Sequence, residues 1–68
     1  LDPERSEHHF GLAKTLDCMD NHRAAFESFR KAVELKPDWA GAIGEMGKQC
    51  MKLGDYPQAI AAFERAIA

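Results

Sequence analysis

Apolar residues recur at helical spacing in two places along the chain. Ala25, Phe29 and Ala32 stand at positions i, i+4 and i+7, which places them on one face of an α-helix. Ala59, Phe63 and Ala66 repeat these three residue types at the same spacing, and similar periodic runs precede each set. The pattern predicts four helices, over residues 4–19, 22–35, 39–53 and 56–68.

Residues that end and begin helices separate these segments. Gly54 can adopt the left-handed conformation that closes a helix. Asp55 is then placed to cap the following helix, with Gln58 as its capping-box partner. Asp20 and Asn21 take the corresponding positions in the first half of the chain, although they suit them less well.

The loop between the second and third segments carries its own stop and start signals. Pro37 prevents the segment over residues 22–35 from continuing as a helix. Asp38 is positioned to cap the segment over residues 39–53. Trp39 follows it, and we favour a packing role at this junction over a role as an exposed binding residue.

The two halves of the chain are related by an internal repeat. When the chain is aligned with itself so that Leu1 meets Leu35, six pairs are identical, and many others keep a small residue small and a large residue large. The identical pairs are Leu1/Leu35, Pro3/Pro37, Lys14/Lys48, Ala25/Ala59, Phe29/Phe63 and Ala32/Ala66. A repeated helix pair is the sequence signature of a stacked array. In this array Ala13 and Gly47 should face Ala25 and Ala59, and the two phenylalanines should fill the gaps between units.

The chain resembles the tetratricopeptide repeat family, whose pattern is W-x2-L-G-x2-Y, A-x3-F, A and P. The second half contains Ile43-x2-Met46-Gly47-x2-Cys50, then Ala59-x3-Phe63 and Ala66; the first contains His9-x2-Leu12-Ala13-x2-Leu16, then Ala25-x3-Phe29, Ala32 and Pro37. The resemblance implies an all-α solenoid of two stacked antiparallel helix-turn-helix units. Residues 1–5 would be the tail of a preceding repeat, 6–39 the first unit, and 40–68 a second unit truncated at its C-terminal end.

The resemblance also implies a binding face, because partners of this family usually lie along the concave surface lined by the first helix of each pair. Carried over residue by residue, the groove would be lined by Phe10, Lys14, Gly41, Gly44, Lys48, Met51 and Lys52. The three lysines would contact carboxylates of an acidic peptide, and the two glycines would leave a shallow apolar floor. The alternatives are a chance match of solvated lysines and a poorly optimised helix.

Two specialised signatures of the family are absent at the positions that would carry them. The carboxylate clamp for chaperone C-terminal tails needs basic and asparagine side chains, but Phe10, Gly41, Gly44 and Glu45 occupy those places. Gly11 and Glu45 stand where an asparagine ladder would begin. Neither binding mode is therefore expected.

Charge and composition exclude several other functions. Nine basic and eleven acidic residues give a net charge of −2, which does not favour nucleic acid as a partner. No apolar run is long enough for a membrane span. Cys18 and Cys50 form no metal or redox motif, so we expect reduced thiols and a cytoplasmic location.

Catalysis and metal binding are not expected either. His8, His9 and His22 match no metal-binding spacing, and we expect them to pack. No nucleophile has a base placed beside it in the sequence. The chain is predicted to be no enzyme and to carry no cofactor.

The function expected is that of a protein-interaction module, whose partner is a protein or peptide of unknown identity. One alternative is a structural or self-assembling segment, because the last helix would expose Ile60, Phe63, Ala66 and Ile67 and could contact another copy. The other is an accessory repeat region of a larger enzyme.

Overall fold

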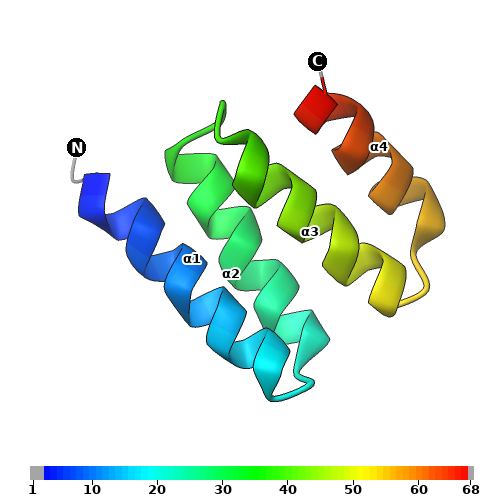
Figure 1. Cartoon of the computed structure of the whole chain (residues 1–68), viewed down its shortest axis with the longest axis horizontal. Helices are drawn as coiled ribbons and strands as arrows, with labels where there is room; N and C mark the ends of the chain where they lie inside the picture. The colour runs from blue at the N-terminus through cyan, green and yellow to red at the C-terminus, as the bar shows by residue number, and fades with distance from the viewer. Residues whose placement is uncertain (1–2, 68) are drawn as a thin grey trace.

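Four antiparallel helices follow one another across the molecule in the computed structural model, which describes residues 3–67 (Figure 1). They are α1 (Pro3–Cys18), α2 (His22–Leu35), α3 (Ala40–Lys52) and α4 (Tyr56–Ile67). Each helix packs on the one before it and the one after it. The all-α arrangement of two helix-turn-helix units is confirmed, and the helix limits lie within one residue of the predicted ones where they fall among the described residues.

The turns within the two units have the same backbone hydrogen bonds. Asn21 N donates to Leu16 O over 2.9 Å in the first unit, and Asp55 N donates to Cys50 O over 2.8 Å in the second. This is the long bond of a Schellman motif, which requires a left-handed residue just before the donor. Gly54 has φ +84° and Asp20 has φ +61°, as the sequence pattern predicted.

The Asp55 cap predicted at α4 is confirmed, but the capping box is not, because the Gln58 side chain reaches the Asp55 carboxylate while Asp55 N donates to Cys50 O. Gln58 N lies 3.5 Å from Asp55 Oδ1, and Gln58 Nε2 donates to Asp55 Oδ2 over 2.8 Å. At α2 the capping position is held by Asn21, whose side chain makes no cap hydrogen bond.

The cap predicted at α3 is wrong. The capping position is held by Trp39 instead of Asp38, and no side chain caps the helix. The Trp39 carbonyl accepts from Ala42 N and Ile43 N, so the helix begins one residue later than expected.

The core is continuous through both units. In the first unit Ala13, Ala25 and Phe29 form a fully buried cluster, so the predicted close approach of α1 and α2 is confirmed. A second cluster contains Val33 of α2, Ala42 and Ile43 of α3, and Ala62 of α4. Half-buried Phe10 and Met46 pack against both clusters.

Both phenylalanines of the repeat pattern pack against small residues of their own unit, which the repeat did not predict. Met46 of the second unit also packs against the cluster that contains Phe29. Phe29 packs among Ala13 and Ala25 within the first unit. Phe63 lies against Gly47 within the second, where an added Cβ on the glycine would be 3.0 Å from Phe63 Cε1. The small residue in each first helix therefore makes room for the phenylalanine of its own unit. Residue 68, predicted as the end of the last helix, lies outside the described residues.

Candidate functional site

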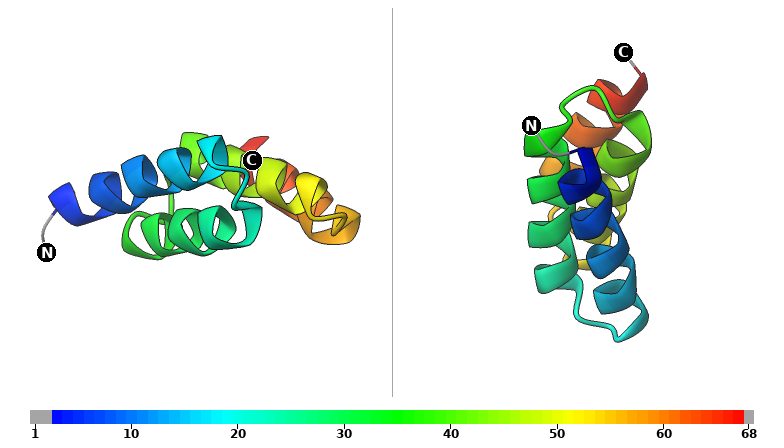
Figure 2. Two further views of the ribbon diagram at one scale, coloured as in Figure 1. Left: turned by 90° about the horizontal axis from the view of Figure 1, so that it is seen from below. Right: turned by 90° about the vertical axis from the view of Figure 1, so that its left-hand side faces the viewer.

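The predicted groove residues belong to α1 and α3, and we call the surface that they would share the α1/α3 face. Its members are Phe10, Lys14, Gly41, Gly44, Lys48, Met51 and Lys52, and each is exposed or half-buried. The left view of Figure 2 shows α2 lying below α1, away from this face. The face is thus accessible, but its residues are not equally available to a partner.

Phe10 is engaged in packing. Its ring stacks on that of Trp39 with centroids 4.6 Å apart, and it meets the Phe29 ring edge to face at 5.4 Å. Offset stacked and edge-to-face pairs at such distances are favourable. Phe10 therefore joins the two units at the loop before α3, and Trp39 has the packing role that we favoured.

The three lysines have different surroundings. Lys14 Nζ lies 5.6 Å from the centroid of the Phe10 ring, a cation–π distance. Lys48 Nζ lies 3.9 Å from Glu45 Oε2, and both charged groups reach solvent. Lys52 Nζ donates to Asp17 Oδ1 over 2.9 Å and so connects α3 to α1. Two of the three lysines of the expected ladder, Lys48 and Lys52, thus already form ion pairs, and the Lys48 pair is the longer one.

The Asp17–Lys52 bond belongs to a polar network at the junction of the two units. His22 Nδ1 lies 3.2 Å from Asp17 Oδ1 and 3.1 Å from Gln49 Oε1, while His22 Nε2 lies 3.9 Å from Asp20 Oδ1. The hydrogen bond from Lys52 lowers the pKa of Asp17 against a weaker opposing effect of burial, and the same bond raises the pKa of Lys52. His22 is therefore a structural residue at this junction, as expected from the sequence.

The glycines of the α1/α3 face differ in what surrounds them. An added Cβ at Gly44 would meet nothing within 4 Å, whereas at Gly41 it would lie 3.4 Å from Trp39 Nε1. Exposed Met51 supplies apolar surface one turn beyond Lys48. The apolar floor predicted here is thus open at Gly44 and bordered by the Trp39 indole at Gly41.

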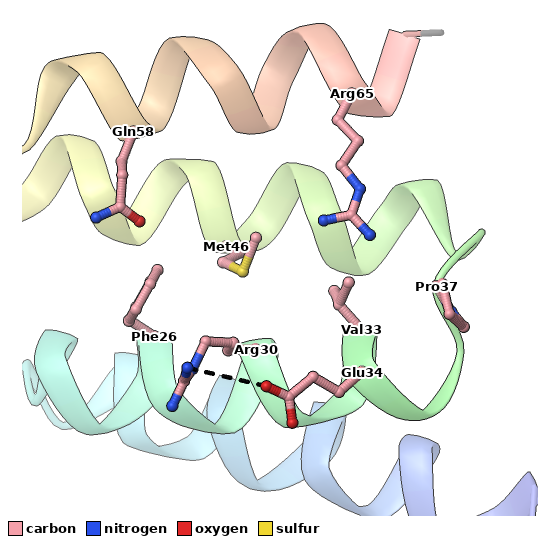
Figure 3. A pocket seen from close by; sticks show the side chains of 8 residues that line it. All are labelled: Phe26, Arg30, Val33, Glu34, Pro37, Met46, Gln58 and Arg65. Atoms are coloured by element: carbon pink, nitrogen blue, oxygen red, sulfur yellow. Dashed lines mark ion pairs between the residues drawn. The ribbon is translucent and has the colours of Figure 1, made fainter.

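A cavity that the sequence did not predict lies on the opposite side, between α2 and α4, and we call it the α2/α4 cavity (Figure 3). It has a volume of about 280 Å³ and is lined by Phe26, Arg30, Val33, Glu34, Pro37, Met46, Gln58 and Arg65. Met46 of α3 points into it, and the Arg65 side chain reaches from α4 toward α2. Arg30 is held by Glu27 at 2.9 Å and by Glu34 at 3.8 Å.

The sequence could not predict this cavity, because its lining comes from both units. Phe26 and Met46 both line it, although they belong to different units. The internal repeat relates equivalent residues, but it does not say which non-equivalent residues meet between neighbouring units.

Both cysteines are free thiols. Cys18 is exposed, and Cys50 is buried beside the second helix turn, where burial and the Asp55 carboxylate raise the pKa of its thiol. Among the described residues no group of three or more His, Cys, Asp or Glu side chains is arranged to hold a metal ion. Within residues 3–67, none of the helices is both long and apolar enough to cross a membrane.

Comparison with known proteins identifies the repeat. The model of a family described as "Tetratricopeptide repeat" matches residues 9–38 and 40–68. The "Hsp70-Hsp90 organizing protein" of Triticum aestivum is 43% identical over 53 residues, which are 78% of this chain and 9% of that protein. The chain therefore spans about a tenth of the length of this relative.

Proposed function

The chain belongs to the tetratricopeptide repeat family, and on this premise we propose that it binds an acidic peptide or protein segment along the α1/α3 face. Proteins built from such repeats use their extended surfaces to hold other proteins. The observation that supports the proposal is that Lys14 of α1 and Lys48 of α3, which stand one repeat apart in the sequence, are both exposed.

Carboxylates of a partner would meet these two lysines. Lys14 forms no ion pair among the described residues, and the Lys48–Glu45 pair is accessible to solvent at 3.9 Å. Exposed pairs of this kind are weak and exchange readily for a partner. Lys52 could bind a partner carboxylate only if its hydrogen bond to Asp17 broke. We therefore assign Lys52 a positioning role between α1 and α3 and not a direct contact with the partner.

Apolar contacts would come from Met51 and from the open space above Gly44. A bulky side chain of the partner could approach the α3 backbone there because no Cβ is present. Phe10 and Trp39 would form the wall of this site and stay in their stacked arrangement. The partner we propose thus combines two carboxylates with an apolar side chain between them.

The name of the wheat relative points to chaperones as one class of partner to test. The residues Phe10, Gly41, Gly44 and Glu45 stand where the family's carboxylate clamp needs basic and amide side chains. We therefore propose contacts through Lys14 and Lys48 instead of the clamp for any acidic chaperone tail that binds. The two free thiols fit a reducing, cytoplasmic setting.

The test is a peptide-binding titration by fluorescence anisotropy. Acidic peptides, including C-terminal segments of Hsp70 and Hsp90, are compared with versions in which amides replace the carboxylates. The Lys14→Glu/Lys48→Glu variant should bind the acidic peptides at least about tenfold more weakly, which corresponds to about 1.4 kcal/mol.

The matched control is Arg23→Glu/Arg65→Glu, which makes the same change of charge on α2 and α4. Arg23 and Arg65 are exposed and form no ion pair among the described residues. This variant should bind almost as well as the original chain. If both variants lose the same affinity for acidic peptides, the loss comes from the change in net charge and not from the α1/α3 face. If neither variant loses affinity, binding at the α1/α3 face is contradicted.

Self-association through α4 is a second candidate, because Tyr56, Ile60 and Ile67 are exposed on this helix. Exposed apolar residues that gather on one face commonly mark a contact surface.

A further inference from the structure

The α2/α4 cavity has the composition of a site for a small ligand, and the proposed function does not use it. Its wall combines apolar surface from Phe26, Val33 and Met46 with the polar ends of a few longer side chains. Ligand sites in proteins are mostly apolar and carry a small number of polar groups that fix the orientation of the ligand. None of the residues that line this cavity belongs to the α1/α3 face.

The size of the cavity limits what can occupy it. Pro37, in the loop before α3, borders one end, and Phe26 and Gln58 border the other (Figure 3). Phe26 and Gln58 also line a second cavity of about 260 Å³, so these two side chains stand between the two cavities. The volume of about 280 Å³ lies just below the range of sites for drug-sized ligands. The cavity therefore suits a small molecule better than a continuous peptide chain.

The charged side chains at the cavity leave one positive charge without a partner. Arg30 of α2, Arg65 of α4 and one carboxylate, that of Glu34, line it among the described residues. Arg30 Nη2 lies 2.9 Å from Glu27 Oε1, and Arg30 Nη1 lies 3.8 Å from Glu34 Oε2. Arg65 forms no ion pair among residues 3–67. Glu34 is thus held by Arg30, and the unpaired charge is that of Arg65.

The exposure of Arg65 does not depend on which elements flank α4. Its counterpart in the first unit is Lys31 of α2, which is exposed although α1 and α3 both pack on α2. A guanidinium group binds a carboxylate through two parallel N–H bonds, and one unpaired charge matches a ligand with one carboxylate. A phosphate monoester carries nearly two charges and would also need Arg30, which Glu27 and Glu34 already hold.

We propose that the α2/α4 cavity binds a small organic carboxylate. The apolar body of the ligand lies against Phe26 and Met46, and its carboxylate accepts hydrogen bonds from Arg65. Glu34 opposes the negative charge of the ligand from the α2 side, so it weakens binding without preventing it. This site is separate from the proposed binding of acidic peptides and does not depend on it.

The methionine methyl groups distinguish binding at this cavity from binding elsewhere. Met46 lines the cavity, whereas Met51 is exposed on α3 and Met19 lies in the turn after α1. The chain, with its methionine methyl groups labelled for NMR, is titrated with hydrocinnamate, a phenyl ring joined to a carboxylate by two methylene groups. The ring should shift the Met46 signal with a Kd of about 1 mM, because a small ligand makes few contacts. The Met19 and Met51 signals should not move.

The amide of the same acid tests the contribution of charge. Hydrocinnamamide has nearly the same shape as hydrocinnamate but no negative charge. It should bind about fivefold more weakly, because it cannot form the ion pair with Arg65. Equal affinity of the acid and the amide would contradict recognition of a carboxylate.

Two substitutions of charged residues should change the affinity for hydrocinnamate in opposite directions. Arg65→Gln removes the guanidinium and should weaken binding about fivefold. Glu34→Gln removes the opposing charge and should strengthen binding about twofold. The matched control is Arg23→Gln, because Arg23 is an exposed arginine that does not line this cavity, and it should leave the affinity unchanged. Loss of folding cannot produce the gain expected for Glu34→Gln.

Several results would overturn the proposal. One is a Met46 signal that does not move at hydrocinnamate concentrations well above the expected Kd. Another is an equal movement of the Met46 and Met51 signals, which would indicate general adsorption to apolar surface. The others are equal affinities of Arg65→Gln and Arg23→Gln, and weaker binding by Glu34→Gln than by the original chain.

This inference and the proposed function fail separately. Lys14→Glu/Lys48→Glu should bind hydrocinnamate as the original chain does and lose affinity for acidic peptides, whereas Arg23→Glu/Arg65→Glu should show the reverse. Acidic peptides should move the Met51 signal and leave the Met46 signal in place. If an acidic peptide moves the Met46 signal and hydrocinnamate does not, the cavity binds a peptide segment and the small carboxylate is excluded as its ligand.

Discussion

Phe29 is completely buried, whereas Phe63, its counterpart in the second unit, is only half-buried. Each follows an alanine at i−4 and precedes another at i+3. Their helices differ in coverage, because α2 has α1 on one side and α3 on the other, while α4 contacts α3. The same three residues at the same spacing therefore differ in burial according to the position of their helix in the array.

The turns of the two units, in contrast, have the same structure although their residues differ. The same long backbone bond closes both turns, although one has Asp20 and the other Gly54 in the left-handed conformation. The turn depends on residues next to one another in the chain, so its form survives an unfavourable residue. Packing depends on neighbours from other elements, so it changes when these differ.

The largest test of this contrast is truncation of the two phenylalanines. Phe29→Ala should lower the free energy of unfolding by about 3–5 kcal/mol, the usual cost for a fully buried aromatic side chain. Phe63→Ala should cost about 2 kcal/mol because less of its surface is buried. Urea unfolding followed by circular dichroism measures both, and equal losses would contradict the difference between the units.

Exchange of the small residue between units is the next test. Gly47→Ala gives the second unit the residue that the first has at Ala13. The new Cβ would lie 3.0 Å from Phe63 Cε1 and 3.2 Å from Ala62 Cβ, so overpacking should outweigh the better helix propensity and cost about 1 kcal/mol. Gly44→Ala is the control, and with open space around it should stabilise by up to about 1 kcal/mol. If both substitutions stabilise the chain, α4 can shift to accommodate the added Cβ at position 47 at little cost.

Exchange of the turn residue gives a smaller effect. Asp20→Gly should stabilise the chain by about 0.5 kcal/mol because glycine adopts a positive φ without steric cost. Gly54→Ala should destabilise it by about 1 kcal/mol for the opposite reason. Thermal melts of the two variants should move in opposite directions, and a loss in Asp20→Gly would indicate that the Asp20 carboxylate near His22 matters more than the backbone.

The smallest effect concerns the pair that connects the units. Lys52 lowers the pKa of Asp17 in the folded chain, so this contribution to stability is present above the unfolded-state pKa of about 3.9. It is lost as the pH falls through the folded-state value. Asp17→Asn should therefore reduce the acid-induced loss of stability below about pH 4, and added salt should weaken the effect at neutral pH. Identical pH profiles for both proteins would exclude this contribution.

Part of the candidate site could be predicted from the sequence, and part could not. Lys14, Lys48 and Met51 are exposed, and their assignment to a binding face stays a prediction of the repeat register. The pairing of Lys52 with Asp17 joins residues far apart in the chain and in different units, which no local pattern encodes. The stacking of Phe10 on Trp39 is of the same kind, because both residues suit a core and a binding face equally well.

The sequence by itself determined the helices, their turns and the repeat, because these depend on residues within a few positions of each other and on one fixed repeat spacing. It could not exclude Asp38 as a cap, since capping depends on how the loop before α3 is held. Only the tertiary structure decided which equivalent residues are buried, which lysines are available and where the α2/α4 cavity lies. The physical reason is that burial and ion pairing depend on neighbours from the other helices, whereas helix formation depends mainly on neighbours along the chain.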